Sequence, residues 1–257
     1  MGSIENFWSS LVSIIILMKV DIPFDNNWKS VAIAVSGGAD SALLAFLVCQ
    51  TVTERNINPF TVHVINNIRC WKTKPWQQSD FKKVYNWLVQ RFPKINFQIH
   101  TNFVPPELEW ANKGPSIIDE YGKLVSGDTL ELRSFAEFVC INQDVDAYFN
   151  GVTRNPKGVD FQGMHTRDIE PTEENRHLKL MIHMGKLVSH PFRFLDKSWI
   201  IKKYYELELE DLLNTTRSCE GTVPGLDYTN YKPYQYVPVC GECFWCKERE
   251  WGIKCQD

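Results

Sequence analysis

The sequence predicts an α/β domain in which helices flank a parallel sheet. Three observations support this: an apolar, β-branched segment at 31–35, a glycine-rich loop directly after it, and an alternation of strand-like and helical segments beyond. A wholly apolar short strand is typical of one buried on both faces, and strands that alternate with helices form parallel sheets. At 257 residues the chain can form one large domain, or a core domain with a small appendage.

The predicted elements of the first half follow in a simple order. The strand at Val31–Val35 is expected to lead into a helix at Ala42–Val48 and a second strand at Phe60–Ile65. An amphipathic helix at Ser79–Phe92, with apolar residues at helical spacing, and a third strand at Asn96–Phe103 follow.

The second half is less regular. Pro105–Gly127 is rich in Pro, Gly and short polar residues and predicts a surface excursion, while Val159–Glu174 predicts a loop over the site. We expect a helix at Thr129–Asn142, a strand at Ala147–Val152, and a helix from Ser198, as its N-cap, to Leu213. The predicted division is an N-terminal extension at 1–28, a main domain at 29–214 and a Cys-rich segment at 215–257.

Charge and composition exclude some functions. The 28 Lys and Arg residues against 31 Asp and Glu give a net charge of -3, which argues against extensive binding to nucleic acid. The apolar stretch Leu11–Val20 is too short to span a bilayer, and Glu5 does not fit a secretory signal, so no membrane association is expected. Five of the eight cysteines lie between 219 and 255, which is typical of a metal site in a reducing, cytoplasmic compartment.

The glycine-rich loop is Ser36-Gly37-Gly38-Ala39-Asp40-Ser41. Glycines bring backbone N–H groups close to an anion, and the N-terminus of the following helix adds partial positive charge. We therefore expect the loop to bind a phosphate or pyrophosphate, with hydroxyl donors from Ser36 and Ser41 and a magnesium ion held by Asp40. It has neither the Walker nor the dinucleotide pattern.

A cluster of cysteines predicts a metal site. Cys240, Cys243 and Cys246 follow at two-residue gaps, Cys219 supplies a fourth thiolate upstream, and Cys255 competes for that fourth place. Four thiolates suit a closed, structural, tetrahedral Zn²⁺ site. An iron–sulfur cluster is the alternative, although the Cys-Pro expected three residues further on is absent.

Both motifs resemble those of known enzymes. The loop is similar to the PP-loop of the ATP pyrophosphatase superfamily, which includes GMP synthetase, NAD synthetase, tRNA thiolases and lysidine synthetase. The C-terminal half resembles the 7-cyano-7-deazaguanine synthase (QueC) family. The matching strings are His190-Pro191-Phe192, Lys197, Thr216-Arg217-Ser218-Cys219 and Cys240-Gly-Glu-Cys243-Phe-Trp-Cys246-Lys-Glu-Arg249.

The resemblance implies a Rossmann-like fold of the adenine nucleotide alpha hydrolase type and a ligase of queuosine biosynthesis. Such an enzyme converts 7-carboxy-7-deazaguanine and ammonia to the nitrile 7-cyano-7-deazaguanine (preQ0). The carboxylate attacks the α-phosphate of ATP to give an acyl adenylate, ammonia displaces AMP to form an amide, and a second adenylation dehydrates the amide. The implied cofactors are ATP, Mg²⁺ and Zn²⁺, and a homodimer is implied.

The resemblance also implies roles for individual residues. Ser36, Asp40 and Ser41 would act in catalysis with Arg133, which would hold a carboxylate or pyrophosphate, and Lys197, which would contact phosphate. From the residues alone, Arg133 and Lys197 can equally be surface cations.

Two segments depart from the family pattern, and both face its substrate side. These are Asn66-Asn67-Ile68-Arg69 after the second strand and Gly151–Pro156 after the fourth. Three alternatives therefore stay open: a tRNA-modifying PP-loop enzyme such as a thiolase, a QueC-like protein that adenylates a related acid, and a nucleotide-binding protein without turnover.

Overall fold

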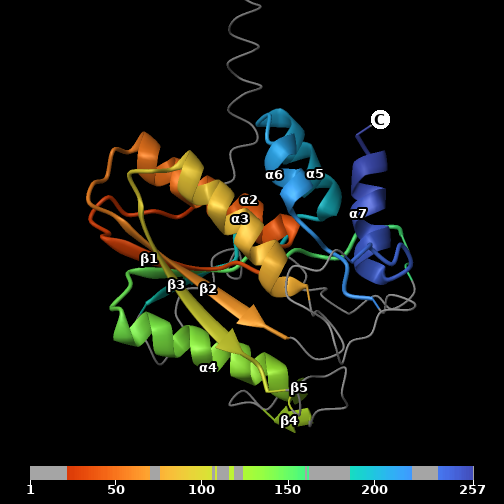
Figure 1. Ribbon diagram of the computed structural model, residues 1–257, viewed down its shortest axis with the longest axis horizontal. Coiled ribbons are helices and arrows are strands. Elements are labelled where there is room, and N and C mark those ends of the chain that lie inside the picture. The colour runs from red at the N-terminus through yellow and green to blue at the C-terminus, as the bar shows by residue number, and fades with distance from the viewer. Residues whose placement is uncertain are drawn as a thin grey trace, which may run out of the picture.

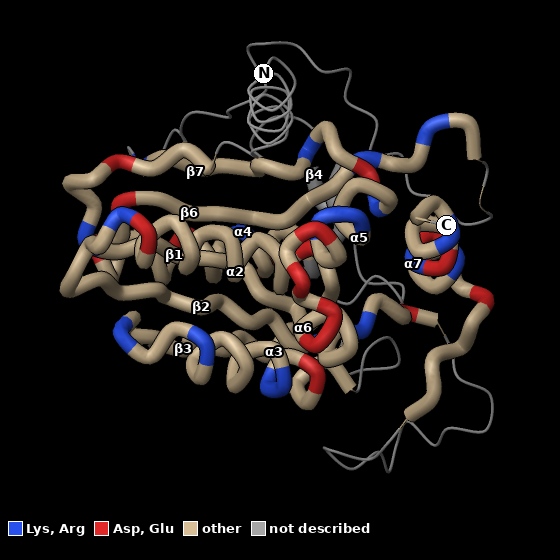
Figure 2. The backbone as a smooth tube through the Cα atoms, turned by 90° about the horizontal axis from the view of Figure 1, so that it is seen from above, with Lys and Arg blue, Asp and Glu red and all other residues tan. Residues whose placement is uncertain are grey.

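A five-stranded, wholly parallel sheet forms the centre of the computed structural model, which describes residues 22–69, 76–105, 108, 116–118, 124–159, 161, 186–221 and 237–256. The strand order is β3-β2-β1-β6-β7, as seen in Figure 2. The α/β class and the parallel sheet are thereby confirmed. The strands are β1 (Ser30–Ala34), β2 (Thr61–Ile68), β3 (Asn96–Phe103), β6 (Ala147–Phe149) and β7 (Leu187–Ser189).

Helices cover both faces of this sheet (Figure 1). One face carries α2 (Ala39–Glu54), α3 (Gln77–Arg91), α5 (Lys197–Glu206) and α6 (Glu210–Thr215), and their apolar side chains form the larger core. The opposite face carries α4 (Gly127–Asn142) over a smaller core. A final helix, α7 (Phe244–Lys254), lies beside α5 beyond the end of the sheet.

The alternation of side chains along β1 explains how it serves both cores. Val31 and Ile33 face the larger core and Ala32 faces α4, and all three are fully buried. Burial of each β-branched side chain contributes about 1.5–3 kcal/mol. The loop that follows β1 therefore begins at a strand that is fixed by packing on both faces of the sheet.

The helix predicted from Ser198 to Leu213 is divided, so that prediction was wrong in two respects. The N-cap is Asp196, whose Oδ1 accepts from the Trp199 N–H at 3.3 Å, and the Ser198 hydroxyl itself donates to Asp196 at 2.6 Å. The predicted cap, Ser198, lies two residues after Asp196 and does not take over the role of the Asp196 carboxylate as acceptor. Glu208 has a φ of 53°, in the left-handed region, and this ends α5 before α6 begins.

Other boundaries also differ from the prediction. The strand expected at Ala147–Val152 ends at Phe149, and Pro105–Gly127 contains an antiparallel pair, β4 (Ser116–Ile118) and β5 (Leu124–Ser126). The segments 11–20 and 162–174, the latter part of the predicted loop, lie outside the described residues. Within the described part of the chain, every helix is too short or too polar to cross a membrane.

Candidate functional site

A crevice of about 650 Å³ opens at the carboxyl ends of β1, β2 and β6. The strand order reverses between β1 and β6, because β2 and β6 lie on opposite sides of β1. Ligands of open parallel sheets bind at such a reversal. The crevice has the volume of a site for a nucleotide-sized ligand.

The glycine loop lies at this point. Ser36, Gly38, Asp40 and Ser41 line the crevice, while Gly37 and Ala39 lie buried beneath them. All six residues of the predicted loop are therefore together, four as lining and two as support.

Gly37 is required by its geometry. Its φ of 84° is in the left-handed region, and a Cβ there would lie 2.7 Å from the backbone nitrogen of Phe81. The N-terminus of α3 therefore packs directly on the loop. On the other side, the Arg217 N–H donates to the Gly37 carbonyl at 2.9 Å.

The two serines fix the shape of the loop. The Ser36 N–H donates to Ser41 Oγ at 3.1 Å, and the Ser41 hydroxyl donates to the Gly38 carbonyl at 3.1 Å. Gly38 is the N-cap of α2 and has no side chain with which to cap the first amide groups. Those amides and the helix dipole make this end of α2 suitable for an anion.

Lys197, at the start of α5, lies against the loop. Its Nζ contacts both carboxylate oxygens of Asp40, at 2.5 and 2.6 Å, and only 2% of its side chain is exposed. Tyr204, two turns further along the same side of α5, donates from its hydroxyl to the Ala39 carbonyl at 2.7 Å. Asp40 and Lys197, each predicted separately as a site residue and distant in sequence, thus meet in one part-buried ion pair.

The far wall of the crevice comes from α4 and from the ends of β6 and β7. Arg133 lines this wall as an exposed side chain, together with Glu137 and His190. Burial, with a contribution from nearby Arg193, lowers the pKa of His190 to about 4. His190 is therefore neutral near pH 7.

Sequence reasoning assigned no role to several residues of the crevice wall, three of which are Trp76, Asp80 and Arg217. The Arg217 guanidinium lies 4.2 Å from the Trp76 ring centroid and donates to the carbonyls of Val237 and Pro238. Its position two residues before Cys219 was the available signal.

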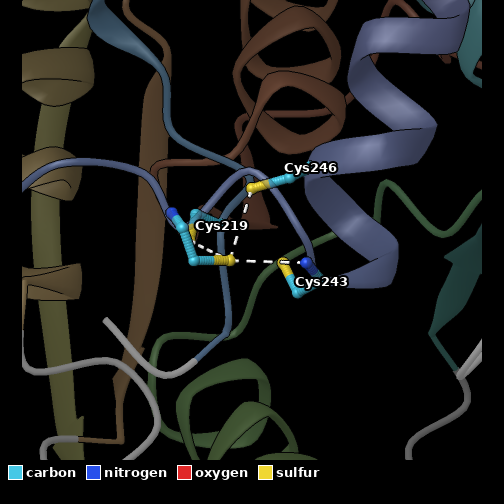
Figure 3. A group of neighbouring side chains, drawn as sticks. Cys219, Cys243 and Cys246 are labelled. Carbon is cyan, nitrogen blue, oxygen red and sulfur yellow. Dashed lines mark hydrogen bonds between the residues drawn. The ribbon is translucent and has the colours of Figure 1, made fainter. Parts of the chain in front are cut away.

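The four predicted cysteines converge. The sulfurs of Cys219, Cys240, Cys243 and Cys246 all lie within 4.8 Å of one another, and Figure 3 shows those of Cys219, Cys243 and Cys246 turned inward. Cys255 is exposed at the far end of α7 and lies outside this group. The fourth candidate ligand is therefore Cys219.

The donor set and spacing fit one tetrahedral metal ion. The Cys219–Cys240 and Cys240–Cys246 sulfur distances are 3.6 and 3.9 Å. Zn–S bonds of about 2.3 Å give tetrahedral edges of about 3.8 Å. Hydrogen bonds to Cys219 and Cys246 also lower the pKa of Cys243, which favours a thiolate.

The helix after the cluster is tied to the main domain. Arg249 of α7 donates to the carbonyls of Thr216 and Leu213, at 3.1 and 2.9 Å. Burial lowers the pKa of this guanidinium. These bonds anchor α7 at the end of α6, between the cysteines and the loop.

Comparison with known proteins gives only distant similarity. No protein-family model and no curated protein matches this chain. A U34-tRNA thiolase, NcsA from Methanococcus maripaludis with its [4Fe-4S] cluster, has 15% identity and a TM-score of 0.44 over 71% of this chain. The match covers 57% of the thiolase, so this chain spans little more than half of its length. An NAD+ synthetase from Burkholderia pseudomallei has 12% identity and a TM-score of 0.36, over 89% of this chain and 81% of its own. Similarity at this level assigns no function.

Proposed function

We propose that this protein is a PP-loop ATP pyrophosphatase that activates a carboxylate by adenylation, with 7-carboxy-7-deazaguanine and ammonia as substrates and 7-cyano-7-deazaguanine as product. One observation carries the ATP chemistry. The glycine loop lies at the strand-order reversal and faces a buried lysine, in a crevice of about 650 Å³. The QueC-like C-terminal strings support the substrate.

The proposed roles follow from position. The amides at the start of α2 and the hydroxyls of Ser36 and Ser41 would bind the phosphates that leave as pyrophosphate. Asp40 would hold magnesium, which neutralises phosphate charge, and Lys197 would offset the charge that develops during transfer. Arg133, on the opposite wall, would bind the substrate carboxylate.

We further propose that the cysteine cluster holds zinc in a structural role. All four positions of the tetrahedron would be filled by thiolates, so no coordination position remains for substrate. The cluster would then act by holding α7 and the segment around Arg217 in place.

The test is mass spectrometry of the purified protein incubated with ATP, magnesium, ammonium and 7-carboxy-7-deazaguanine. A nitrile product with AMP and pyrophosphate is expected. ATP cleavage without nitrile would reject this substrate and retain the adenylation chemistry with a related acid. No cleavage under any condition would reject the enzyme and favour a nucleotide-binding role.

A tRNA-modifying enzyme is the competing proposal, and metal analysis separates the two. Copurified tRNA with about four irons per chain would support a thiolase. One zinc per chain without tRNA is the result expected here. The short sulfur–sulfur distances favour the latter.

A further inference from the structure

Lys197 has a second acidic neighbour besides Asp40. Glu248 Oε2 lies 3.9 Å from Lys197 Nζ, and the Glu248 side chain is 0% exposed. Asp40 is closer, at 2.5 Å, and is 21% exposed on the crevice side. The ammonium therefore lies between a carboxylate that faces the ligand site and one that faces the protein interior.

Glu248 belongs to the helix that the cysteine cluster anchors. Cys243 is the N-cap of α7, Cys246 lies in its first turn, and Glu248 follows two residues later. One turn further, a Cβ on Gly252 would come within 3.0 Å of the Lys197 Cγ and carbonyl oxygen. Thus α7 covers Lys197 with a carboxylate and, at a glycine, with its own backbone.

This arrangement disfavours magnesium binding by Asp40 in the state observed. Lys197 Nζ occupies both oxygens of Asp40, and a positive charge there repels a divalent cation. Each oxygen keeps a second lone pair, so both cations can share Asp40, but their mutual repulsion favours magnesium uptake when Lys197 releases at least one oxygen. A buried ammonium that loses its counter-charge is strongly destabilised, so release requires another anion nearby.

We propose that Glu248 is a positioning residue that receives Lys197 when Asp40 binds magnesium. Lys197 would exchange Asp40 for Glu248 and a phosphate oxygen of ATP. The ammonium has three N–H groups, enough to contact both, and it keeps its proton throughout. This inference rests on the proposed function, because the exchange requires MgATP at the loop.

The test measures how α,β-methylene ATP binds to the protein as magnesium is titrated. This analogue cannot be cleaved at the proposed bond, and the cysteine cluster is loaded with its metal beforehand. Glu248→Gln is expected to raise the magnesium concentration for half-maximal binding about tenfold or more. Glu250→Gln is the matched control, because Glu250 is exposed on the same helix and pairs with Lys254 at 2.6 Å. Its titration is expected to overlay that of the wild type.

The outcomes separate this inference from the proposed function. A Glu248→Gln curve equal to the wild-type curve would overturn the inference and leave the function standing. Wild-type protein that binds no nucleotide at any magnesium concentration would overturn both.

A second variant and two controls exclude a purely structural explanation. Glu248→Asp keeps the charge and is expected to remain within about threefold of the wild type. If Glu248→Asp raises the magnesium concentration for half-maximal binding as much as Glu248→Gln does, the effect depends on side-chain volume rather than charge. That result would overturn the proposed exchange. Metal content and melting temperature are measured on each variant. A Glu248→Gln protein that melts earlier with an unchanged magnesium curve likewise counts against the inference.

Discussion

The glycine loop and the cysteine cluster are built in opposite ways. The loop consists of six consecutive residues between a buried strand and a buried helix. The cluster joins Cys219 to Cys240–Cys246, and in the part of the chain that the structure describes Cys219 shares a small buried group with Trp76 and Val237. The hydrophobic core holds the first region, whereas the second has sulfur ligands where a core would otherwise be.

The difference predicts that the two regions can be disrupted separately. Loss of metal should release α7 and the chain near Arg217 while the sheet stays folded. Loss of a loop residue should instead impair the proposed nucleotide binding and leave the four cysteines converged. Lys197 is the point where both regions act on one side chain.

The largest expected effect is on the loop side. Asp40→Asn removes the proposed magnesium ligand and should lower pyrophosphate release by about a hundredfold to a thousandfold. Far-UV circular dichroism should be unchanged, although the melting temperature should fall because Lys197 loses its nearest counter-charge. Retention of activity within tenfold would remove Asp40 from the proposed mechanism.

The next effect tests the cluster. Cys243→Ser removes one of four ligands and should abolish stoichiometric metal binding, with a loss of about 3 kcal/mol or more in unfolding free energy. Elemental analysis and urea denaturation measure the two quantities. Cys255→Ser is the control, since this exposed thiol lies outside the cluster, and it should change neither. An equal loss of metal in both variants would contradict the assignment of Cys219 as the fourth ligand.

A smaller effect measures how tightly the loop is packed. Gly37→Ala should cost about 2–3 kcal/mol, because it combines a positive φ with an overlap against the Phe81 backbone. Gly158 also has a positive φ, 72°, but a Cβ there meets nothing within 4 Å. Gly158→Ala should therefore cost only about 1 kcal/mol. Equal losses in urea denaturation would mean that contact with α3 does not constrain the loop.

Much of the loop region could be predicted because its signals are local. An apolar strand, a glycine pair and a helical period occur within short windows, and the strand at Asn96–Phe103 was predicted with both ends correct. The cysteine spacing likewise predicted the converging group, although only the structure distinguishes Cys219 from Cys255.

The remainder depends on contacts distant in sequence. Leu187–Ser189 is too short to display a period, and it is a strand only because it pairs with β6. The N-cap at Asp196 differs from the predicted one by two residues of similar chemistry. In the sequence Glu248 is one charge among several on a helix, and its proximity to Lys197 is seen only in the folded structure, where α7 packs on α5.

The smallest expected effect concerns pH and again separates the two regions. His63 of β2 and His100 of β3 are 3.0 Å apart, Nδ1 to Nε2. Burial, together with the neighbouring His100, lowers the pKa of His63 to about 4. The unfolded chain, with a histidine pKa of about 6.5, therefore binds a proton that the folded chain excludes. The stability from the neutral pair is complete above about pH 6.5 and is lost as the pH falls toward 4.

This loss should amount to about 1–2 kcal/mol between pH 7 and pH 5, and His63→Gln should reduce the wild-type pH dependence by that amount in urea denaturation. If the variant keeps the whole pH dependence, the sheet is not its source. Acid would then act at the cluster, where protons compete with metal for the thiolates, and Cys243→Ser would remove the dependence instead. The two variants together assign the acid sensitivity either to the histidine pair in the sheet or to the cysteine cluster.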